Sequence, residues 1–262
     1  MAADDRTLKK LDTLIRHTRQ NTQMIERHFA HQVWQGLGAD KVVSFPYHGA
    51  DIRFFVPDGW LDAVQRIILL NRTFYEAHLL EKIRALVPPG ATFVDAGANI
   101  GNHAVYFAKL CRAAHVHAFE AMPHMQAVLG RNAELNGPDQ ITVHPFALGA
   151  AEGTADVAIF NPANLGSTTL EAGRAGSIPV RTLDSFALQD VAFIKIDVEG
   201  MQDAVLDGAR DTIARCRPTM VIEAFDRGEE RVKTQTLLGE LGYGVAEIVG
   251  HNIIAIPAQA QE

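Results

Sequence analysis

The chain has 262 residues, of which 47% are hydrophobic, and it carries a formal net charge of −7 at pH 7. It is long enough to bury the core of one large domain with a small appendage. The acidic balance argues against nucleic-acid binding, which relies on clustered Lys and Arg. No apolar run approaches the roughly 20 residues that span a bilayer, and the N-terminus MAADDRTLKK lacks the apolar centre of a secretory signal. We therefore expect a cytoplasmic protein without a membrane span.

The N-terminal residues 1–35 are expected to form a helical arm. Within it, a strict 3-4 spacing typical of a coiled-coil seam connects Leu8, Leu11, Ile15, Thr18, Thr22, Ile25, Phe29 and Gln32. The middle of this seam is polar, which weakens it but can also fix register and oligomer state. Two interpretations stay open. The arm either joins copies of the chain into a homo-oligomer, or it is a single amphipathic helix that lies on the main domain.

The next segment, residues 36–72, predicts an accessory linker with short strands rather than a domain. Its Gly and Pro residues favour turns, and VVSF and IRFFV are strand-like runs. A helix is predicted over 73–86, because apolar positions recur there at helical spacing before Pro88-Pro89-Gly90. We assign residues 73–262 to the main domain.

Helices and buried strands alternate through this main domain. Apolar, strand-like runs occupy 92–95, 115–119, 141–146, 191–196 and 219–225, and helical stretches occupy 101–112, 123–136, 201–215 and 229–241. Two last strands, 243–249 and 252–256, are close enough to form a hairpin with an antiparallel strand. The expected fold is α/β, a doubly wound and mostly parallel sheet with helices on both faces. Ligands of such sheets bind beyond the carboxyl ends of the strands, near the switch in strand order.

Residues 150–185 interrupt the alternation. This interval is rich in Gly, Ala, Ser, Thr and Asn, with an expected hairpin around NPANLGSTT. An insertion at the ligand edge is a natural place for a lid or a substrate loop. By composition, the run Asn164-Leu165-Gly166-Ser167-Thr168 is only a turn.

The stretch FVDAGANIGNHAVYF places a glycine turn between a strand and a helix. A dinucleotide site would have G-x-G-x-x-G, but here Asn99 replaces the second glycine, and Asp95 would repel a pyrophosphate. The pattern favours a small zwitterion such as S-adenosyl-L-methionine, whose ammonium and carboxylate need an acceptor and backbone donors. The turn residues expected at the cofactor are Asp95, Gly97, Ala98, Asn99, Gly101 and Asn102.

Further cofactor contacts are expected from the neighbouring strand ends. Glu120, 25 residues beyond Asp95, ends the next strand and suits the two ribose hydroxyls, with Ala121 beside it. Phe146 and Ala147 follow the third strand and are candidates for the adenine, although Phe146 is equally an ordinary core residue. Two residues of the preceding helix, Tyr75 and Glu76, are expected to reach the methionine end.

Several blocks together carry a family resemblance. DAGANIG (95–101), HAFEAMP (117–123), VRTLDSF (180–186), IKIDVEG (194–200) and RPTMVIEAF (217–225) resemble the FkbM family of S-adenosylmethionine-dependent methyltransferases. The resemblance runs from about Tyr75 to Phe225 and leaves the N-terminal arm outside. The loop Asn164-Leu165-Gly166-Ser167-Thr168 also resembles a segment often present in the family, which implies a lid that closes over the cofactor or the acceptor. It implies a class I, Rossmann-like methyltransferase fold and methyl transfer to oxygen, on a hydroxyl of a sugar, glycan or natural product, with S-adenosyl-L-homocysteine as the product.

The chemistry of the transfer also asks for a base, because an alcohol has a high pKa and the acceptor oxygen must lose its proton. Asp197 and Glu199 end the strand FIKIDVEG at the ligand edge. We take Asp197 as the general base or as an acceptor-orienting carboxylate that also touches the cofactor. Glu199 either supports it or only caps the following helix.

Two histidines are rival bases, and a metal is a further alternative. His103 and His124 each start a helix near the cofactor edge, where the helix dipole favours a neutral imidazole. A divalent, magnesium-type ion could use Asp197 and Glu223, since hard cations prefer carboxylate oxygens. No His/Cys cluster has zinc spacing.

The sequence therefore predicts an S-adenosylmethionine-dependent O-methyltransferase with a hydroxyl-bearing acceptor, oligomeric through its arm. One alternative is a catalytically silent scaffold that keeps the cofactor fold and recruits glycan-synthesis partners. Another is a methyltransferase that acts on a non-carbohydrate small molecule or a carboxylate. A nicotinamide oxidoreductase is disfavoured by Asn99. The acceptor and the methylated position stay open.

Overall fold

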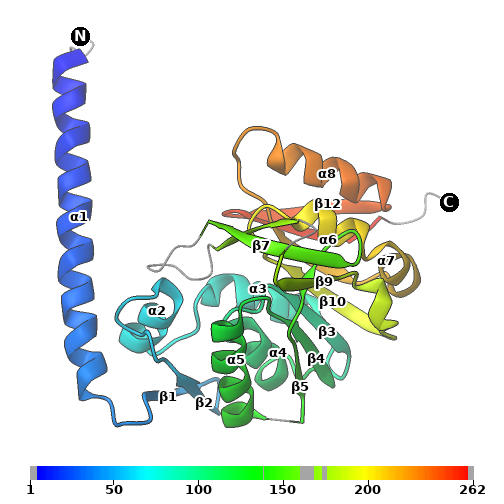
Figure 1. Cartoon of the computed structure of the whole chain (residues 1–262), viewed down its shortest axis with the longest axis horizontal. Helices are drawn as coiled ribbons and strands as arrows, with labels where there is room; N and C mark the ends of the chain where they lie inside the picture. The colour runs from blue at the N-terminus through cyan, green and yellow to red at the C-terminus, as the bar shows by residue number, and fades with distance from the viewer. Residues whose placement is uncertain (1–4, 138, 160–167, 173–175, 259–262) are drawn as a thin grey trace.

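A seven-stranded sheet forms the centre of the computed structural model, which describes residues 5–137, 139–159, 168–172 and 176–258 (Figure 1). The strand order is β12-β13-β11-β10-β3-β4-β5. Its members are β3 (Thr92–Ala96), β4 (His115–Phe119), β5 (Ile141–His144), β10 (Val191–Ile196), β11 (Thr219–Glu223), β12 (Tyr243–Val249) and β13 (Asn252–Pro257). Pairing from β5 to β11 is parallel, and β13 runs antiparallel to both of its neighbours. The predicted sheet and its C-terminal hairpin are therefore confirmed.

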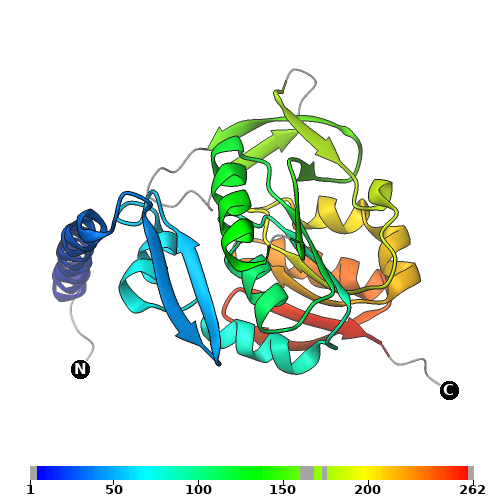
Figure 2. The ribbon, with the colours of Figure 1, turned by 90° about the horizontal axis from the view of Figure 1, so that it is seen from below.

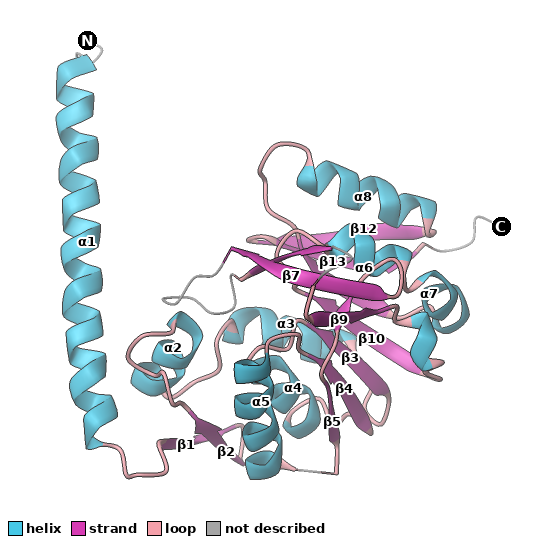
Figure 3. Cartoon of the chain, in the orientation of Figure 1, coloured by secondary structure: helices cyan, strands magenta, loops and turns pink. Residues whose placement is uncertain are grey.

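Helices cover both faces of this sheet (Figure 3). They are α3 (Ala77–Leu86), α4 (Asn102–Lys109), α5 (Pro123–Asn136), α6 (Gln202–Asp207), α7 (Arg210–Cys216) and α8 (Glu230–Glu240). Because strand side chains alternate, Phe93 and Phe193 join the core under α3, α4 and α5, whereas Val94 and Ile194 join the core under α6, α7 and α8. Two fully buried cores thus sandwich the strands, as expected for a doubly wound sheet.

Two predicted helices differ from the structure. The helix expected over 201–215 is broken into α6 and α7, because Gly208 lies against the backbone of Gly149 and the chain turns there. The helix expected over 73–86 begins only at Ala77. An additional helix, α2 (Ala63–Asn71), lies in the segment predicted as linker and strands; the Asp62 side chain caps its start by accepting a hydrogen bond from the Gln65 N–H.

A second, four-stranded sheet interrupts the alternation, in the order β6-β9-β7-β8. Its strands are β6 (Ala147–Leu148), β7 (Gly153–Ile159), β8 (Thr169–Ala172) and β9 (Ile178–Arg181). β7 and β8 pair antiparallel, so the strands that flank the predicted hairpin are observed. Residues 160–167, including the proposed lid positions Asn164 to Ser167, lie outside the described residues.

The first helix, α1 (Asp5–Gly36), runs beside the body and extends well past it (Figure 1). Its last turns attach it to the body. The Trp34 indole N–H donates to the Val56 carbonyl at 2.9 Å, and Glu26 pairs with Arg66 of α2 at 3.1 Å. Among the described residues, no helix combines the length and the apolar character needed to cross a membrane.

A small hairpin of β1 (Val42–Tyr47) and β2 (Ala50–Phe55) lies between α1 and α5 (Figure 2). Two amides of α5 hold its edge. The buried Asn132 accepts from the Phe55 N–H at 2.7 Å and donates to the Ile100 carbonyl at 2.8 Å, and Asn136 binds both backbone groups of Arg53. These side chains replace a missing neighbouring strand, because buried backbone groups must be paired.

We expect Asn132→Ala to lower the free energy of unfolding by about 2 to 4 kcal/mol, since it leaves buried backbone groups of Phe55 and Ile100 without partners. Urea denaturation measures this loss. The neighbouring exposed substitution Arg131→Ala, which removes only a surface pair with Glu134, should cost less than about 0.5 kcal/mol. Equal decreases in the free energy of unfolding in the two variants would contradict the role of Asn132 in holding the hairpin.

Candidate functional site

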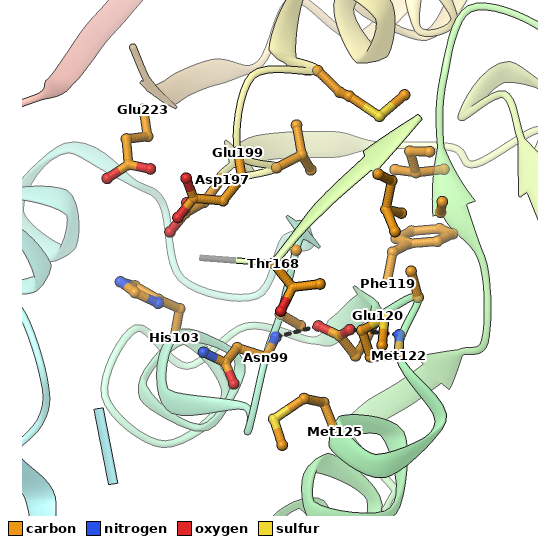
Figure 4. Close-up of a pocket in the computed structure, with 18 of the residues that line it drawn as sticks. Asn99, His103, Phe119, Glu120, Met122, Met125, Thr168, Asp197, Glu199 and Glu223 are labelled. Atoms are coloured by element: carbon orange, nitrogen blue, oxygen red, sulfur yellow. Dashed lines mark hydrogen bonds between the residues drawn. The ribbon is translucent and has the colours of Figure 1, made fainter. Parts of the chain in front are cut away.

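A cavity of about 270 Å³ opens at the carboxyl ends of the parallel strands (Figure 4). The strand order reverses between β3 and β10, so the turns after these two strands meet here. Most predicted site residues line the cavity: Tyr75, Gly97, Ala98, Asn99, Asn102, His103, Glu120, Ala121, Phe146, Ala147, Asp197, Glu199 and Glu223. Four do not line it: Glu76, Asp95, Gly101 and His124.

The glycines of the β3 to α4 turn are required by packing. Gly97 and Gly101 both have positive φ, at 80° and 86°. The space of a Gly97 side chain is filled by the carbonyl group of Asp197, and that of Gly101 by Leu129 of α5. We expected both glycines to bring the main chain close to a ligand. The structure accounts for Gly101 by its packing against Leu129, and its contact with a ligand stays a prediction.

Asn99 stands where a dinucleotide-binding turn has its second glycine, and its backbone conformation explains why Asn fits there. It adopts the left-handed conformation, with φ 51°, which Asn tolerates better than most residues. Its backbone N–H donates to Oε2 of Glu120 at 2.8 Å, and its buried Oδ1 has no hydrogen-bond partner among the described residues. The turn therefore leaves one buried polar atom unsatisfied beside the cavity.

Glu120 is the acidic group at the end of β4. Its two oxygens accept hydrogen bonds from the N–H groups of Asn99 and Met122, each at 2.8 Å (Figure 4). Burial nevertheless raises the pKa of Glu120 to about 7, against the lowering effect of these bonds. Each oxygen keeps a lone pair for a ligand, so the group is oriented and ready to accept two hydroxyls.

Asp95 lies behind the cavity wall. It is completely buried, and neither carboxylate oxygen has a hydrogen-bond partner of ordinary geometry among the described residues. It is paired in register with Lys195 of β10. Burial raises the pKa of Asp95, while His103 and Lys195 act in the opposite direction. Asp95 does not line the cavity, and its expected contact with a cofactor ammonium stays a prediction.

Three carboxylates gather on the opposite side of the cavity. Oxygens of Asp197, Glu199 and Glu223 lie within 4.8 Å of one another (Figure 4). Burial and the charge of Asp197 raise the pKa of Glu223 to about 9 and that of Glu199 to about 7. Burial also opposes ionisation of Asp197, but Lys195 and a hydrogen bond from Glu223 hold its pKa below the usual value. The cluster is thus an ionised Asp197 beside a protonated Glu223.

Lys195 is the cation of this cluster, and the sequence interpretation missed it. Its side chain is 1% exposed, and its Nζ lies 2.7 Å from Oδ2 of Asp197. Burial lowers the pKa of a lysine, yet Asp197 and Asp95 together raise that of Lys195 above its ordinary value. One signal was available, since a lysine inside the apolar run VAFIKI must find an acidic partner.

The segment before α3 closes the cavity from the side. The Asn102 side chain accepts from the Tyr75 N–H at 2.9 Å and donates to its carbonyl at 3.1 Å. Glu76, with φ 53°, lies 3.3 Å from Nε2 of His103 and accepts from Asn252 at 3.2 Å. Burial opposes ionisation of Glu76, but His103 holds its pKa below the ordinary value. Tyr75 and Glu76 are thus in a turn, not in the predicted helix, and Glu76 supports the wall from behind.

His124 is not at the cavity. It is exposed on α5 and lies 2.8 Å from Asp58. Although the residue does begin a helix after β4, the helix start turns its ring outward to the α2 side. The structure therefore places His124 away from the cavity, and its role as a rival base stays an untested prediction.

Some lining residues were not predicted. Val64 comes from α2, which was itself missed, and Leu170 comes from β8 of the second sheet. Thr168, the described end of the loop predicted to be a lid, also lines the cavity. Phe225 and His251 enter from the end of β11 and the turn before β13. This last pair could have been found, because an antiparallel strand starts at the edge where its parallel neighbour ends.

The sheet order, the antiparallel β13 and the cavity at the switch define a class I, Rossmann-like methyltransferase. Comparison with known sequences agrees. The family described as methyltransferase FkbM domain matches residues 95–245, and the chain belongs to this family.

Individual relatives are distant. "Methyltransferase 1" of Beauveria bassiana is 26% identical over 186 residues, which cover 61% of this chain and 74% of the relative. A solved methyltransferase FkbM from Methylobacillus flagellatus KT has a TM-score of 0.48 at 22% identity, over 74% of this chain and 52% of its own. The chain thus spans about half of that protein. Magnesium protoporphyrin IX methyltransferase of Synechocystis PCC 6803, solved with bound SAM, has a TM-score of 0.46 at 13% identity. The match covers 77% of this chain and 86% of that protein.

The raised pKa of Glu223 makes the free energy of unfolding of the protein depend on pH. Above pH about 4.5 the folded state holds a proton that the unfolded state has released, so stability falls as pH rises through about 9. We expect Glu223→Gln, which mimics the protonated form, to flatten the decrease between pH 7 and 9 in urea denaturation. The exposed Glu229→Gln serves as the control. An unchanged slope in Glu223→Gln would show that Glu223 ionises without cost.

Proposed function

We propose that this protein transfers the methyl group of S-adenosyl-L-methionine to a hydroxyl oxygen of a sugar, glycan or natural-product acceptor. The observation that carries the proposal is the arrangement of acids around one cavity. Glu120 stands alone at one side, and Asp197, Glu199 and Glu223 stand together at the other. One side suits a ribose, and the other suits a hydroxyl that must lose a proton.

The residues present fit the cofactor. Glu120 is oriented by two backbone N–H groups and can accept from a pair of vicinal hydroxyls. Apolar side chains near it, Phe119, Met122, Phe146 and Leu148, line the cavity and suit the faces of an adenine. When bound, S-adenosyl-L-methionine supplies a methyl group activated by a sulfonium. The chain's own task is to align the acceptor and accept its proton.

Glu199 is the carboxylate that suits proton removal best. A general base works best with a pKa near the working pH, and the pKa of Glu199 is raised to about 7. Asp197 was the first candidate from the sequence, but its ion pair with Lys195 makes it a weak base. We assign Asp197 to orienting the acceptor through an ionised oxygen, with the protonated Glu223 donating a hydrogen bond beside it.

Charge also favours a hydroxyl over a carboxylate acceptor. Lys195, the buried cation beside the cavity, already faces two carboxylates, the buried Asp95 and the partly exposed Asp197. An acceptor anion would therefore meet Asp197 and Glu199 without a free cation from this lysine. A neutral hydroxyl meets groups that accept and donate hydrogen bonds.

Cofactor binding is tested by calorimetry with S-adenosyl-L-homocysteine. We expect wild type to bind it and Glu120→Gln to bind on the order of 10- to 100-fold more weakly, because the substitution removes one acceptor from a buried ribose site. The surface variant Glu229→Gln should bind as wild type does. No binding by wild type would overturn the cofactor assignment, and it is also what the scaffold alternative permits.

The base is tested by turnover. The assay uses labelled S-adenosyl-L-methionine and a panel of glycosides and hydroxylated natural products. We expect Glu199→Gln to lower kcat by about 10²- to 10⁴-fold while its affinity for S-adenosyl-L-homocysteine stays unchanged. His103→Gln, a variant of the rival base, should retain more activity. Near wild-type turnover in Glu199→Gln would refute the assignment.

Adding a chelator to the same assay tests the metal alternative on Asp197, Glu199 and Glu223, and we expect unchanged turnover.

A further inference from the structure

The N-terminal helix presents an apolar seam that the body does not cover. Ile15, Ile25 and Phe29 are 41%, 71% and 57% exposed, and the polar seam positions Thr18 and Thr22 are exposed as well. These residues follow the 3-4 spacing that keeps them on one side of a straight helix. An apolar stripe of this kind in water marks a surface that binds something.

The helix uses a different side to attach to the body. Ala30 is buried, and Glu26 pairs with Arg66. His31 packs edge-on against Trp60, with ring centroids 5.0 Å apart. At about 100° per residue, Ala30 lies roughly one quarter turn from Phe29 and the seam. Attachment to the body therefore leaves the seam open, and the interpretation in which the seam itself lies on the main domain is wrong.

The exposed half of the helix also lacks support. A helix of 32 residues is about 48 Å long, and its contacts with the body are confined to the last turns (Figure 1). Isolated helical segments of a dozen residues are marginal in water, because packing of an amphipathic face supplies most helical stability. A partner along the seam would supply that packing.

We propose that the seam pairs with the same seam of a second copy of this chain, as a two-stranded coiled coil. Two features favour this partner. The three exposed apolar positions of the seam keep coiled-coil spacing. Among the described side chains of α1, the other exposed large apolar residues are Leu14 and Met24, and these two do not widen the stripe into the broad apolar face of a membrane-surface helix. Thr18, Thr22 and Gln32 interrupt it, which suits a register-setting polar layer between helices and opposes burial in lipid. A second copy offers the identical seam, so the contact closes by two-fold symmetry.

Adjacent residues on α1 provide a matched test. Ile25 lies on the seam and is 71% exposed, whereas Met24 lies off the seam and is 69% exposed. In sedimentation equilibrium, we expect the full chain to have twice the 28.6 kDa mass of one copy. Ile25→Asp should weaken association on the order of 100-fold or more, because it places like charges opposite each other. Met24→Asp should stay dimeric. Ile15→Asp, farther from the body, should repeat the effect of Ile25→Asp.

The thermal unfolding of the body separates dissociation from misfolding, and we expect Ile15→Asp to leave it unchanged. A wild-type protein that is monomeric throughout the micromolar range overturns the proposal, as does equal dissociation in Met24→Asp and Ile25→Asp. A third outcome would assign the seam to a membrane instead: the wild type is monomeric and floats with phosphatidylglycerol vesicles, and Ile25→Asp does not float.

Discussion

The carbonyl group of Asp197 fills the space in which a side chain of residue 97 would lie, and the Asp197 N–H donates to the Ala96 carbonyl at 2.9 Å. The turns after β3 and β10 are thereby held in direct backbone contact at the point where the strand order reverses. Neither turn can shift without the other. Asn99 is in turn bonded to Glu120, so the turn after β4 is tied into the same unit. Direct contacts therefore link the walls on both sides of the cavity, which carry its acidic groups.

Within that unit, one buried cation decides the protonation of the acids. Lys195 lies between Asp95 and Asp197 and stabilises their charges, but it does not compensate Glu199 and Glu223 to the same extent. The environment separates carboxyl groups of similar intrinsic acidity into an ionised one, a protonated one and one poised near neutral pH. Such a separation is what acid and base roles require.

The sequence was sufficient for features that rest on local periodicity. The parallel strands, the closing hairpin and the position of the glycine turn follow from alternating apolar runs and turn residues, and all are observed. It was insufficient where tertiary contacts decide. Gly101 is required by Leu129, which is distant in the chain, and α2 depends on its Asp62 cap and on burial against α1 and the hairpin. Asp95 and His124 sit at the predicted ends of their elements, yet the core and Asp58 turn them away from the cavity. Direction of a side chain at an element's end is a tertiary property.

The turn that carries Glu199 has a further consequence. Glu199 and Gly200 are consecutive residues with positive φ, at 46° and 90°, and the first is a residue type that rarely adopts this conformation. The backbone strain is met by the folding of the whole domain, so the carboxylate is presented without any rearrangement at the moment it is used. If Glu199 is the base, as we propose, stability and activity make opposite demands on this position. Gly or Asn at position 199 would relieve this strain, because both tolerate a positive φ, but it would also remove the carboxylate that we propose as the base.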